Sequence, residues 1–170
     1  PDILAVHPFG RIPGLCDGDI CIWETAAILN YLDECFDTGT SLRPGSIVER
    51  TRAVQWISAV NSYFYDTMVR RFVLQMLFPK GEGGKPDRAV ISAALAEMPA
   101  QFAALDAAYA KGPWLAGNGF SGADLFLAPI LAYVQAFPEG GQLMAGYPNL
   151  LRGQALVCER ASFKATSPQT

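Results

Sequence analysis

The stretch His7–Thr25, HPFGRIPGLCDGDICIWET, decides the fold of the first part of the chain. Two short apolar runs flank an Asp-Gly-Asp turn, which is typical of a β-hairpin with one run in each strand. Pro13 has no N–H, so it belongs at the start of a strand or in a bend, where a cis peptide bond can occur. The residues after Thr25 favour a helix. The stretch therefore predicts a hairpin that is entered through Ile12-Pro13 and followed by a helix.

The ends of this hairpin carry groups that suit a small peptide. If the Ile12-Pro13 bond is cis, the backbone of Ile12 turns outward, and an extended peptide could pair with it as an added strand. Eleven residues after Pro13, Glu24 and Thr25 open the helix, where free N–H groups attract a carboxylate and Thr25 can cap or donate its hydroxyl. Glu24 can accept an ammonium in a charge-assisted bond of about 1.5 to 3 kcal/mol.

Each of these features has a structural explanation when it stands alone. An X-Pro step before a strand is usually a turn, and a Glu-Thr pair before a helix is usually a cap. Their joint spacing, with a hairpin between them and an apolar helix after them, favours a site for the two charged groups of an amino acid.

The same stretch resembles the glutathione transferase family, in its cytosolic, bacterial-type form. The family pattern NPFGxVP followed by E-S/T corresponds here to HPFGRIP and WETAAILNYLDECF, with His7 in place of the more usual Asn. The resemblance continues through WLAGNGFSGADLFLAPILAY to ERASFKATSP and covers almost the whole chain. It implies a thioredoxin-like α/β domain, present here as the hairpin plus one helix, followed by an all-α domain.

The resemblance also implies a site and an activity. Ile12, beside Pro13, offers its backbone to the cysteinyl part of glutathione, Glu24 and Thr25 hold the γ-glutamyl end, and Arg11 reaches the same ligand. The implied enzyme joins the glutathione thiol to a small hydrophobic electrophile, as in detoxification, or uses it to reduce or isomerise a substrate. A non-catalytic glutathione-binding protein and a transferase-like scaffold for protein association are the alternatives.

A polar stretch with Gly and Pro, residues 37–46, marks a linker. We therefore expect the glutathione-binding domain at residues 1–42 and the helical domain at residues 43–170. One hairpin and one helix are too little sheet for a stable α/β domain. The resemblance implies a β-α-β segment ahead of Pro1, which carries the Ser, Tyr or Cys that activates the thiol, so no catalytic residue is assigned in this chain.

A long helix is expected from about Val48 to Phe78, with apolar residues on steps of four. These residues are Trp56, Val60, Phe64, Met68, Phe72 and Met76. Steps of four drift by about 40° per repeat on an α-helix, so the stripe should wind around the helix and need several neighbours to cover it. A homodimer partner and a substrate pocket are candidates. The pocket is assigned to Tyr63, Tyr65, Phe72 and Met76, and plain core packing is the alternative for each.

Two further helical segments follow. The alanine-rich segment Pro86–Lys111 contains Pro99, so it forms either two helices or one kinked helix. A last helix is expected from Pro148 to about Glu159, with a polar tail after it.

The sequence FSGADL, residues 120–125, carries the start signal of another helix. Ser121 stands at the N-cap and Asp124 three residues later, which is the spacing of a capping box, and Phe120 against Leu125 would form the hydrophobic staple. Both polar residues are assigned a structural role.

Composition limits the function classes. The chain of 170 residues is 51% hydrophobic and 17% charged, with a formal charge of −3 and a pI near 5.1. An acidic chain without basic runs argues against binding to nucleic acid. The absence of a long apolar stretch or an apolar leader argues against a membrane protein and favours a cytoplasmic one.

The four cysteines are Cys16, Cys21, Cys35 and Cys158, and His7 is the single histidine. Their spacing matches no metal site, so no metal is expected. Cys16 and Cys21 flank the turn, where two cysteines can face one another. In a cytosolic chain, however, buried free thiols are the favoured interpretation.

Overall fold

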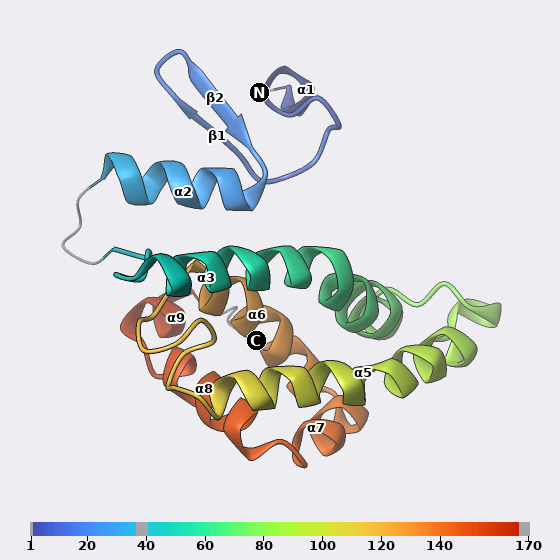
Figure 1. Cartoon of the computed structure of the whole chain (residues 1–170). Helices are drawn as coiled ribbons and strands as arrows, with labels where there is room; N and C mark the ends of the chain where they lie inside the picture. Colours follow the sequence, from blue (N-terminus) through green and yellow to red (C-terminus); the bar gives the residue numbers. More distant parts are fainter. Residues whose placement is uncertain (1, 37–40, 167–170) are drawn as a thin grey trace. The chain divides into compact units, whose positions relative to one another are not determined.

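A computed structural model describes residues 2–36 and 41–166 of the chain. It divides into two compact units, Pro1–Arg43 and Pro44–Thr170 (Figure 1). Residues 37–40 of the expected linker lie outside the described residues. The chain therefore consists of a small α/β unit and a larger helical unit.

The first unit consists of a hairpin and two helices. In chain order these are α1 (Ile3–Val6), β1 (Gly14–Asp17), β2 (Ile20–Trp23) and α2 (Thr25–Cys35). The strands are antiparallel, with Cys16 opposite Cys21 and Asp17 opposite Ile20. Two residues form the turn, and the first of them, Gly18, has a φ of +56°, as in a type II′ turn, whose twist suits a hairpin.

Polar contacts and the backbone ladder hold the first unit together. The Tyr31 hydroxyl of α2 donates to Asp17 Oδ2 of β1 at 2.9 Å, and this hydrogen bond to a carboxylate is the main cause that raises the pKa of Tyr31 to about 12. At the other end of α2, Asp33 Oδ1 accepts from the Leu42 N–H at 2.6 Å. Among the described residues of this unit, His7 is the one that is buried, at 2% exposure. The unit therefore has almost no apolar core of its own.

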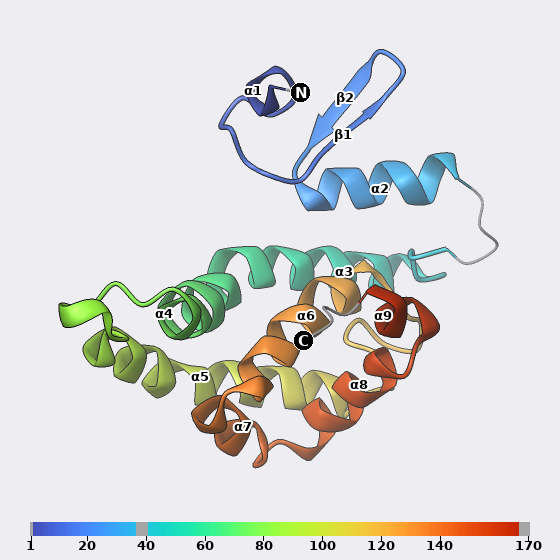
Figure 2. The ribbon, with the colours of Figure 1, turned by 180° about the vertical axis from the view of Figure 1, so that it is seen from behind.

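The second unit is built of helices. They are α3 (Ile47–Ala59), the π-helix η1 (Val60–Val73), α4 (Leu74–Leu77), the short 3₁₀ turn η2 (Glu82–Gly84), α5 (Arg88–Tyr109), α6 (Gly122–Ala136), α7 (Pro138–Met144), α8 (Pro148–Cys158) and α9 (Ala161–Thr166). α6 packs against α3, η1, α7 and α8, and Figure 2 shows these elements from behind. None of the helices in the described part of the chain is both long and apolar enough to cross a bilayer.

The hydrophobic core of the second unit lies between η1, α5 and α6. Fully buried side chains from these three elements include Met68, Phe72, Met98, Phe102, Leu127 and Leu131. Tyr147 closes one side, because its ring packs edge-on against Phe102 at 5.5 Å and its hydroxyl donates to Pro99 O at 3.0 Å. Pro99 lies inside α5, which is one helix, so the two-helix alternative does not hold.

Four of the apolar residues on steps of four lie in a π-helix and not in the α-helix that was expected. Val60, Phe64, Met68 and Phe72 are all buried, and they all lie in η1. A π-helix bonds residue i to residue i+5 and holds more residues per turn than an α-helix. The drift of about 40° per repeat expected for an α-helix therefore does not apply over Val60–Val73, where a π-helix carries the stripe.

A capping box opens α6 at Ser121. Asp124 Oδ2 accepts from the Ser121 N–H at 3.0 Å and from the Ser121 hydroxyl at 3.1 Å. Its Oδ1 accepts from the Leu115 N–H at 2.8 Å and from the Tyr109 hydroxyl at 3.3 Å. Burial raises the pKa of Asp124 although these donors act to lower it. One carboxyl group thus ties the start of α6 to the end of α5.

Candidate functional site

The peptide bond between Ile12 and Pro13 is cis. The strand ladder begins only at Gly14, so Ile12 lies outside it. Ile12 is 84% exposed, which is unusual for a large apolar side chain and leaves the backbone beside it open. An extended ligand can therefore approach the chain at this residue as a further strand.

Glu24 stands between β2 and α2 in a rare backbone conformation. Its φ is +72°, and it is the one described residue other than glycine with a positive φ. Such a conformation costs about 1 to 3 kcal/mol and is found mainly at functional sites. The side chain of Glu24 is 62% exposed and caps no N–H group of α2. The site therefore combines an exposed carboxylate with a helix start that no side chain covers.

His7 and two aromatic residues support the loop before Pro13. His7 Nδ1 accepts from the Phe9 N–H at 3.2 Å, and the His7 ring lies 5.1 Å from that of Trp23. His7 Nε2 lies 4.0 Å from Glu24 Oε1. In the sequence, His7 is marked only as the residue that stands in place of the more usual Asn, and no supporting role was predicted for it. The signal for its supporting role is that replacement, because an Asn side chain can also accept from the N–H two residues on.

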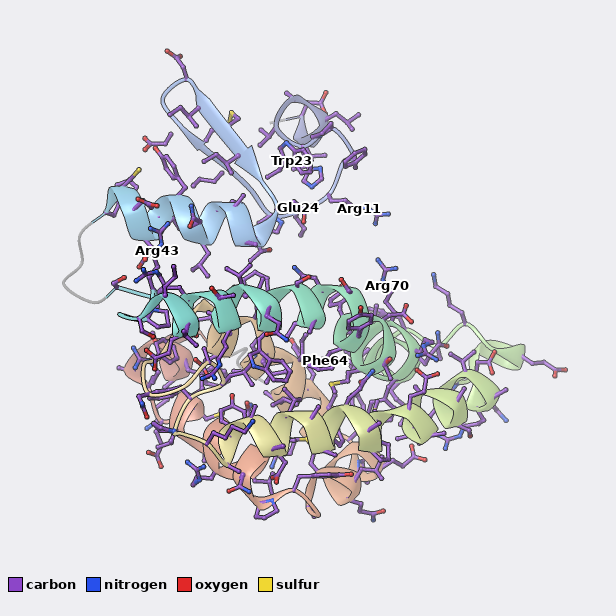
Figure 3. All side chains as sticks on the ribbon, viewed as in Figure 1. Arg11, Trp23, Glu24, Arg43, Phe64 and Arg70 are labelled. Carbon is purple, nitrogen blue, oxygen red and sulfur yellow. A yellow bond between two sulfur atoms is a disulfide. The ribbon has the colours of Figure 1, made fainter. Side chains whose placement is uncertain are left out.

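The hairpin register brings the predicted binding residues to one end. Because Gly14 pairs with Trp23, Pro13 and Glu24 come next along the two strands at the end opposite the turn. Figure 3 shows Arg11, Trp23 and Glu24 at this end of the hairpin. Thr25 begins α2 there, and both Arg11 and Thr25 are exposed. The arrangement offers a cation, a carboxylate, a helix start and an open backbone within one short segment.

The four residues assigned to a substrate pocket are not alike in the structure. Tyr63 is 65% exposed and Tyr65 is 40% exposed, and the guanidinium of Arg70, which is labelled in Figure 3, lies 5.5 Å from the Tyr65 ring centre. Met76 is half-buried. Phe72 is fully buried and packs edge-on against Phe137 at 5.8 Å. Phe72 is therefore a core residue and does not form the wall of an open pocket.

A groove of about 440 Å³ lies elsewhere in the helical unit. It runs between α6, α8 and α9, and its described lining residues include Leu125, Pro129, Tyr133, Val157 and Phe163. None of the four predicted pocket residues lines it.

Cys16 and Cys21 form a disulfide, and both side chains are exposed. The favoured interpretation of buried free thiols is therefore wrong for this pair. The cause is the turn: in a two-residue hairpin, Asp17 and Ile20 form the hydrogen-bonded pair, so the next pair is a close, non-hydrogen-bonded one. The Cα atoms of Cys16 and Cys21 are 4.2 Å apart. Cys35 and Cys158 are free, and burial raises the pKa of Cys158.

No three His, Cys, Asp or Glu side chains gather into a metal-binding group within residues 2–36 and 41–166.

Comparison with known proteins places the chain in a family. Residues 1–34 match the model of the glutathione S-transferase N-terminal domain, and residues 88–152 match that of the C-terminal domain. The chain is 30% identical over 167 residues to glutathione S-transferase 3 of Zea mays, which covers 98% of this chain and 74% of that protein.

Solved structures of relatives have the same fold. Apo glutathione S-transferase III superposes with a TM-score of 0.85 at 29% identity, over 100% of this chain and 80% of that one. Maize glutathione S-transferase I in complex with an atrazine glutathione conjugate gives a TM-score of 0.82 at 25% identity, over 98% and 80% of the two chains. The α/β unit with a cis-proline hairpin, the helical unit and these matches together show that the chain belongs to the glutathione S-transferase family.

Proposed function

We propose that this chain binds glutathione at the end of its hairpin and acts as a glutathione transferase, joining the thiol to a small hydrophobic electrophile. The observation that carries the proposal is Glu24, an exposed carboxylate held at positive φ beside an uncapped helix start and across the hairpin from cis-Pro13. Relatives with the same fold are named glutathione S-transferases, and one of them holds a glutathione conjugate.

The charges of glutathione match the groups at this end of the hairpin. Its ammonium would pair with Glu24, and the adjacent carboxylate would accept from the first-turn N–H groups of α2 and the Thr25 hydroxyl. The cysteinyl part would pair with the backbone of Ile12 beside Pro13, as an added strand. Arg11 would neutralise the remaining carboxylate. The site thus holds both ends of the tripeptide and leaves the thiol free to react.

The reaction needs a thiolate, since the thiolate and not the thiol is the nucleophile. We assign no catalytic residue among those of this chain. A Ser, Tyr or Cys in a β-α-β segment ahead of Pro1 would stabilise the thiolate by hydrogen bonding. Determining the residues that precede Pro1 tests this part of the proposal. We also propose that the protein belongs to a bacterial-type subgroup of the family, which comparison with other family members tests.

The binding proposal is tested by Glu24→Gln in the full-length protein. Losing a charge-assisted bond of about 1.5 to 3 kcal/mol should weaken glutathione binding by about 10- to 100-fold, measured by isothermal titration calorimetry. Asp19→Asn is the matched control, because Asp19 is an exposed carboxylate at the turn, on the opposite end of the hairpin. Equal affinities of the two variants would sink the proposal. Glutathione binding by the wild type without any conjugation activity would favour the non-catalytic binding protein instead.

The substrate side and the quaternary structure are further parts of the proposal. Tyr63, Tyr65 and Met76 on the helix from Ile47 to Leu77 remain candidates for contact with the electrophile. A homodimer is supported by exposed apolar side chains on the same helix, since Ile47 is 72% and Val54 is 67% exposed. Sedimentation velocity on the full-length protein checks the dimer, and a monomer at micromolar concentration would contradict it. We further propose a cytoplasmic protein that does not bind nucleic acid.

A further inference from the structure

The disulfide between Cys16 and Cys21 lies on the hairpin that also carries the proposed glutathione site. We propose that this pair is a thiol–disulfide exchange site for glutathione, at which the protein is reversibly S-glutathionylated. The identity of the attacking thiol rests on the proposed function, because a protein that works with glutathione meets it at high concentration. The exchange itself needs only an accessible disulfide and a low-molecular-weight thiolate.

Both sulfur-bearing side chains are accessible. Cys16 and Cys21 are exposed, and the turn beside them consists of Gly18 and Asp19, of which Gly18 has no side chain and has open space where a Cβ would be. Exchange requires that a thiolate approach one sulfur of the disulfide. A disulfide on a two-stranded surface hairpin allows this approach without any movement of the core.

Contacts other than the disulfide also hold the hairpin. The same residues are aligned by the backbone ladder from Gly14–Trp23 to Asp17–Ile20, and Asp17 is tied to α2 through the Tyr31 hydroxyl at 2.9 Å. The bond closes a short loop, with a sequence separation of 5, so it removes less entropy from the unfolded chain than a disulfide that closes a long loop. The disulfide can therefore open and close while the hairpin stays folded.

This independence separates an exchange site from a structural disulfide. Structural disulfides hold a fold together and resist glutathione, whereas exposed ones are the labile and regulatory class. In a reducing compartment, disulfides that do form are usually transient and catalytic or redox-sensing. The exposed pair of this hairpin has the properties of the second class.

The exchange is balanced by glutathione alone. A glutathione thiolate attacks the sulfur of Cys16 or Cys21, the protein S–S bond breaks, a new S–S bond to glutathione forms, and the other cysteine leaves as a thiolate that takes up a proton. A second glutathione thiolate then attacks the mixed disulfide, so that the protein holds two thiols and oxidised glutathione is released. Two electrons pass from two glutathione molecules to the protein disulfide, and oxidised glutathione drives the reverse reaction.

The exchange site is distinct from the proposed binding site. Cys16 is three residues from Pro13 and Cys21 is three residues from Glu24, which at about 3.3 Å per residue is about 10 Å along each strand. A change at Glu24 should therefore leave the exchange intact.

The test uses the full-length native protein in buffers of defined reduced-to-oxidised glutathione ratio, followed by alkylation, intact mass and peptide mapping. We expect the bond between Cys16 and Cys21 to be intact in excess oxidised glutathione, and both cysteines to be free thiols in excess reduced glutathione, without denaturant. Cys16→Ser should trap one glutathionyl group on Cys21, and Cys21→Ser should trap one on Cys16. Cys35→Ser is the control variant and should exchange as the wild type does. Circular dichroism of each variant should match that of the wild type.

Three outcomes would overturn the proposal. The first is a disulfide that opens only in denaturant, the second is glutathionylation confined to Cys35 or Cys158, and the third is four free thiols even in excess oxidised glutathione. Glu24→Gln separates this test from that of the proposed function. Exchange retained in Glu24→Gln with glutathione binding lost supports both proposals, whereas exchange in a wild type that binds no glutathione refutes the proposed function alone.

Discussion

Glu24 combines two properties that substitutions can separate. Its carboxylate is proposed to bind the ligand, and its φ of +72° strains any residue with a Cβ. Glycine adopts positive φ without this strain. We therefore expect Glu24→Ala and Glu24→Gly to lose glutathione affinity equally, while Glu24→Gly is about 1 kcal/mol more stable than Glu24→Ala.

Chemical denaturation of the two variants side by side measures this difference. Wild-type affinity in either variant would contradict the binding role of the carboxylate. A less stable Glu24→Gly would show instead that the backbone of Glu24 is not strained.

The sequence allowed some residues of the site to be predicted and not others. A bend or a helix start could be predicted at Ile12, Pro13 and Glu24 from their side chains or backbone restrictions. The structure brings these residues to one end of the hairpin. The positive φ of Glu24 could not be predicted, because no glycine or asparagine marks it. Phe72 was misassigned because an aromatic residue on a helical stripe looks the same in the sequence whether it faces the core or a pocket.

At the scale of elements, the contact between α5 and α8 depends on a glycine. A Cβ at Gly153 would lie 2.3 Å from Tyr109 Cε1 and 2.4 Å from Tyr109 Cδ1. The Tyr109 ring cannot easily move, since it is 1% exposed and its hydroxyl donates to Asp124. Overpacking of this kind costs about 1 to 3 kcal/mol, so Gly153→Ala should lower the melting temperature by several degrees.

The control for this change is Gly146→Ala. A Cβ at Gly146 would meet the Leu143 carbonyl oxygen at 3.7 Å, which is an ordinary contact. Differential scanning calorimetry should therefore find Gly146→Ala close to the wild type. Equal melting temperatures for Gly153→Ala and the wild type would mean that the two helices can separate at little cost.

A carboxylate of α5 caps the start of α8. Asp106 Oδ1 accepts from the N–H groups of Asn149 and Leu150 at 2.8 and 3.0 Å, and Oδ2 accepts from Asn149 Nδ2 at 3.0 Å. Burial acts to raise the pKa of Asp106, but the hydrogen bonds from Asn149 and Leu150 outweigh it and lower the pKa below its ordinary value of 3.8. The ionised form is thus favoured by folding.

The sign of the pH dependence follows from this lowered pKa. The stabilisation is fully present above pH values near the unfolded pKa of 3.8 and is lost as the pH falls through the lower folded pKa. Asp106→Asn should cost about 1 kcal/mol at pH 7 after allowance for solvent screening, and the difference from the wild type should shrink as the pH falls below 4. Urea titrations at several pH values measure this. A difference that stays constant down to pH 2 would refute the assignment, and Glu159→Gln, at an exposed position, serves as the control.

The helices and the hairpin were predictable to different degrees. The hairpin followed from its turn residues, and the start of α6 followed from the Ser-x-x-Asp spacing. α7 and α9 were not expected, because Gly140-Gly141 disfavours a helix and the tail is short and polar, although Pro138 at the first turn of α7 was a usable signal. The π-helix could not be predicted, since a repeat of four is compatible with both helix types.

At the scale of the whole molecule, the two units differ in how much apolar surface they bury. Every residue of the hydrophobic core cluster lies between Ala53 and Leu150, in the helical unit. Chains of about 40 residues without such a core rarely fold alone. We expect a fragment of residues 44–170 to unfold cooperatively on heating, measured by circular dichroism at 222 nm, and a fragment of residues 1–43 to give no thermal transition.

Each fragment would be compared with the full-length protein under the same conditions. A cooperative transition in residues 1–43 would show that the hairpin unit has stability of its own. A broad, non-cooperative transition in residues 44–170 would show that the helical unit does not fold cooperatively by itself.

The π-helix from Val60 to Val73 has a consequence for how the length of this protein can change over evolutionary time. In an α-helix, loss of one residue turns everything after it by about 100°, which takes a buried face out of the core. A turn closed by hydrogen bonds from residue i to residue i+5 contains one residue more than the corresponding turn of an α-helix. It can therefore absorb the loss of one residue by tightening into an α-helical turn. Between Ala59 and Leu74, therefore, this helix can accept a deletion at a depth in the core where helices ordinarily accept none.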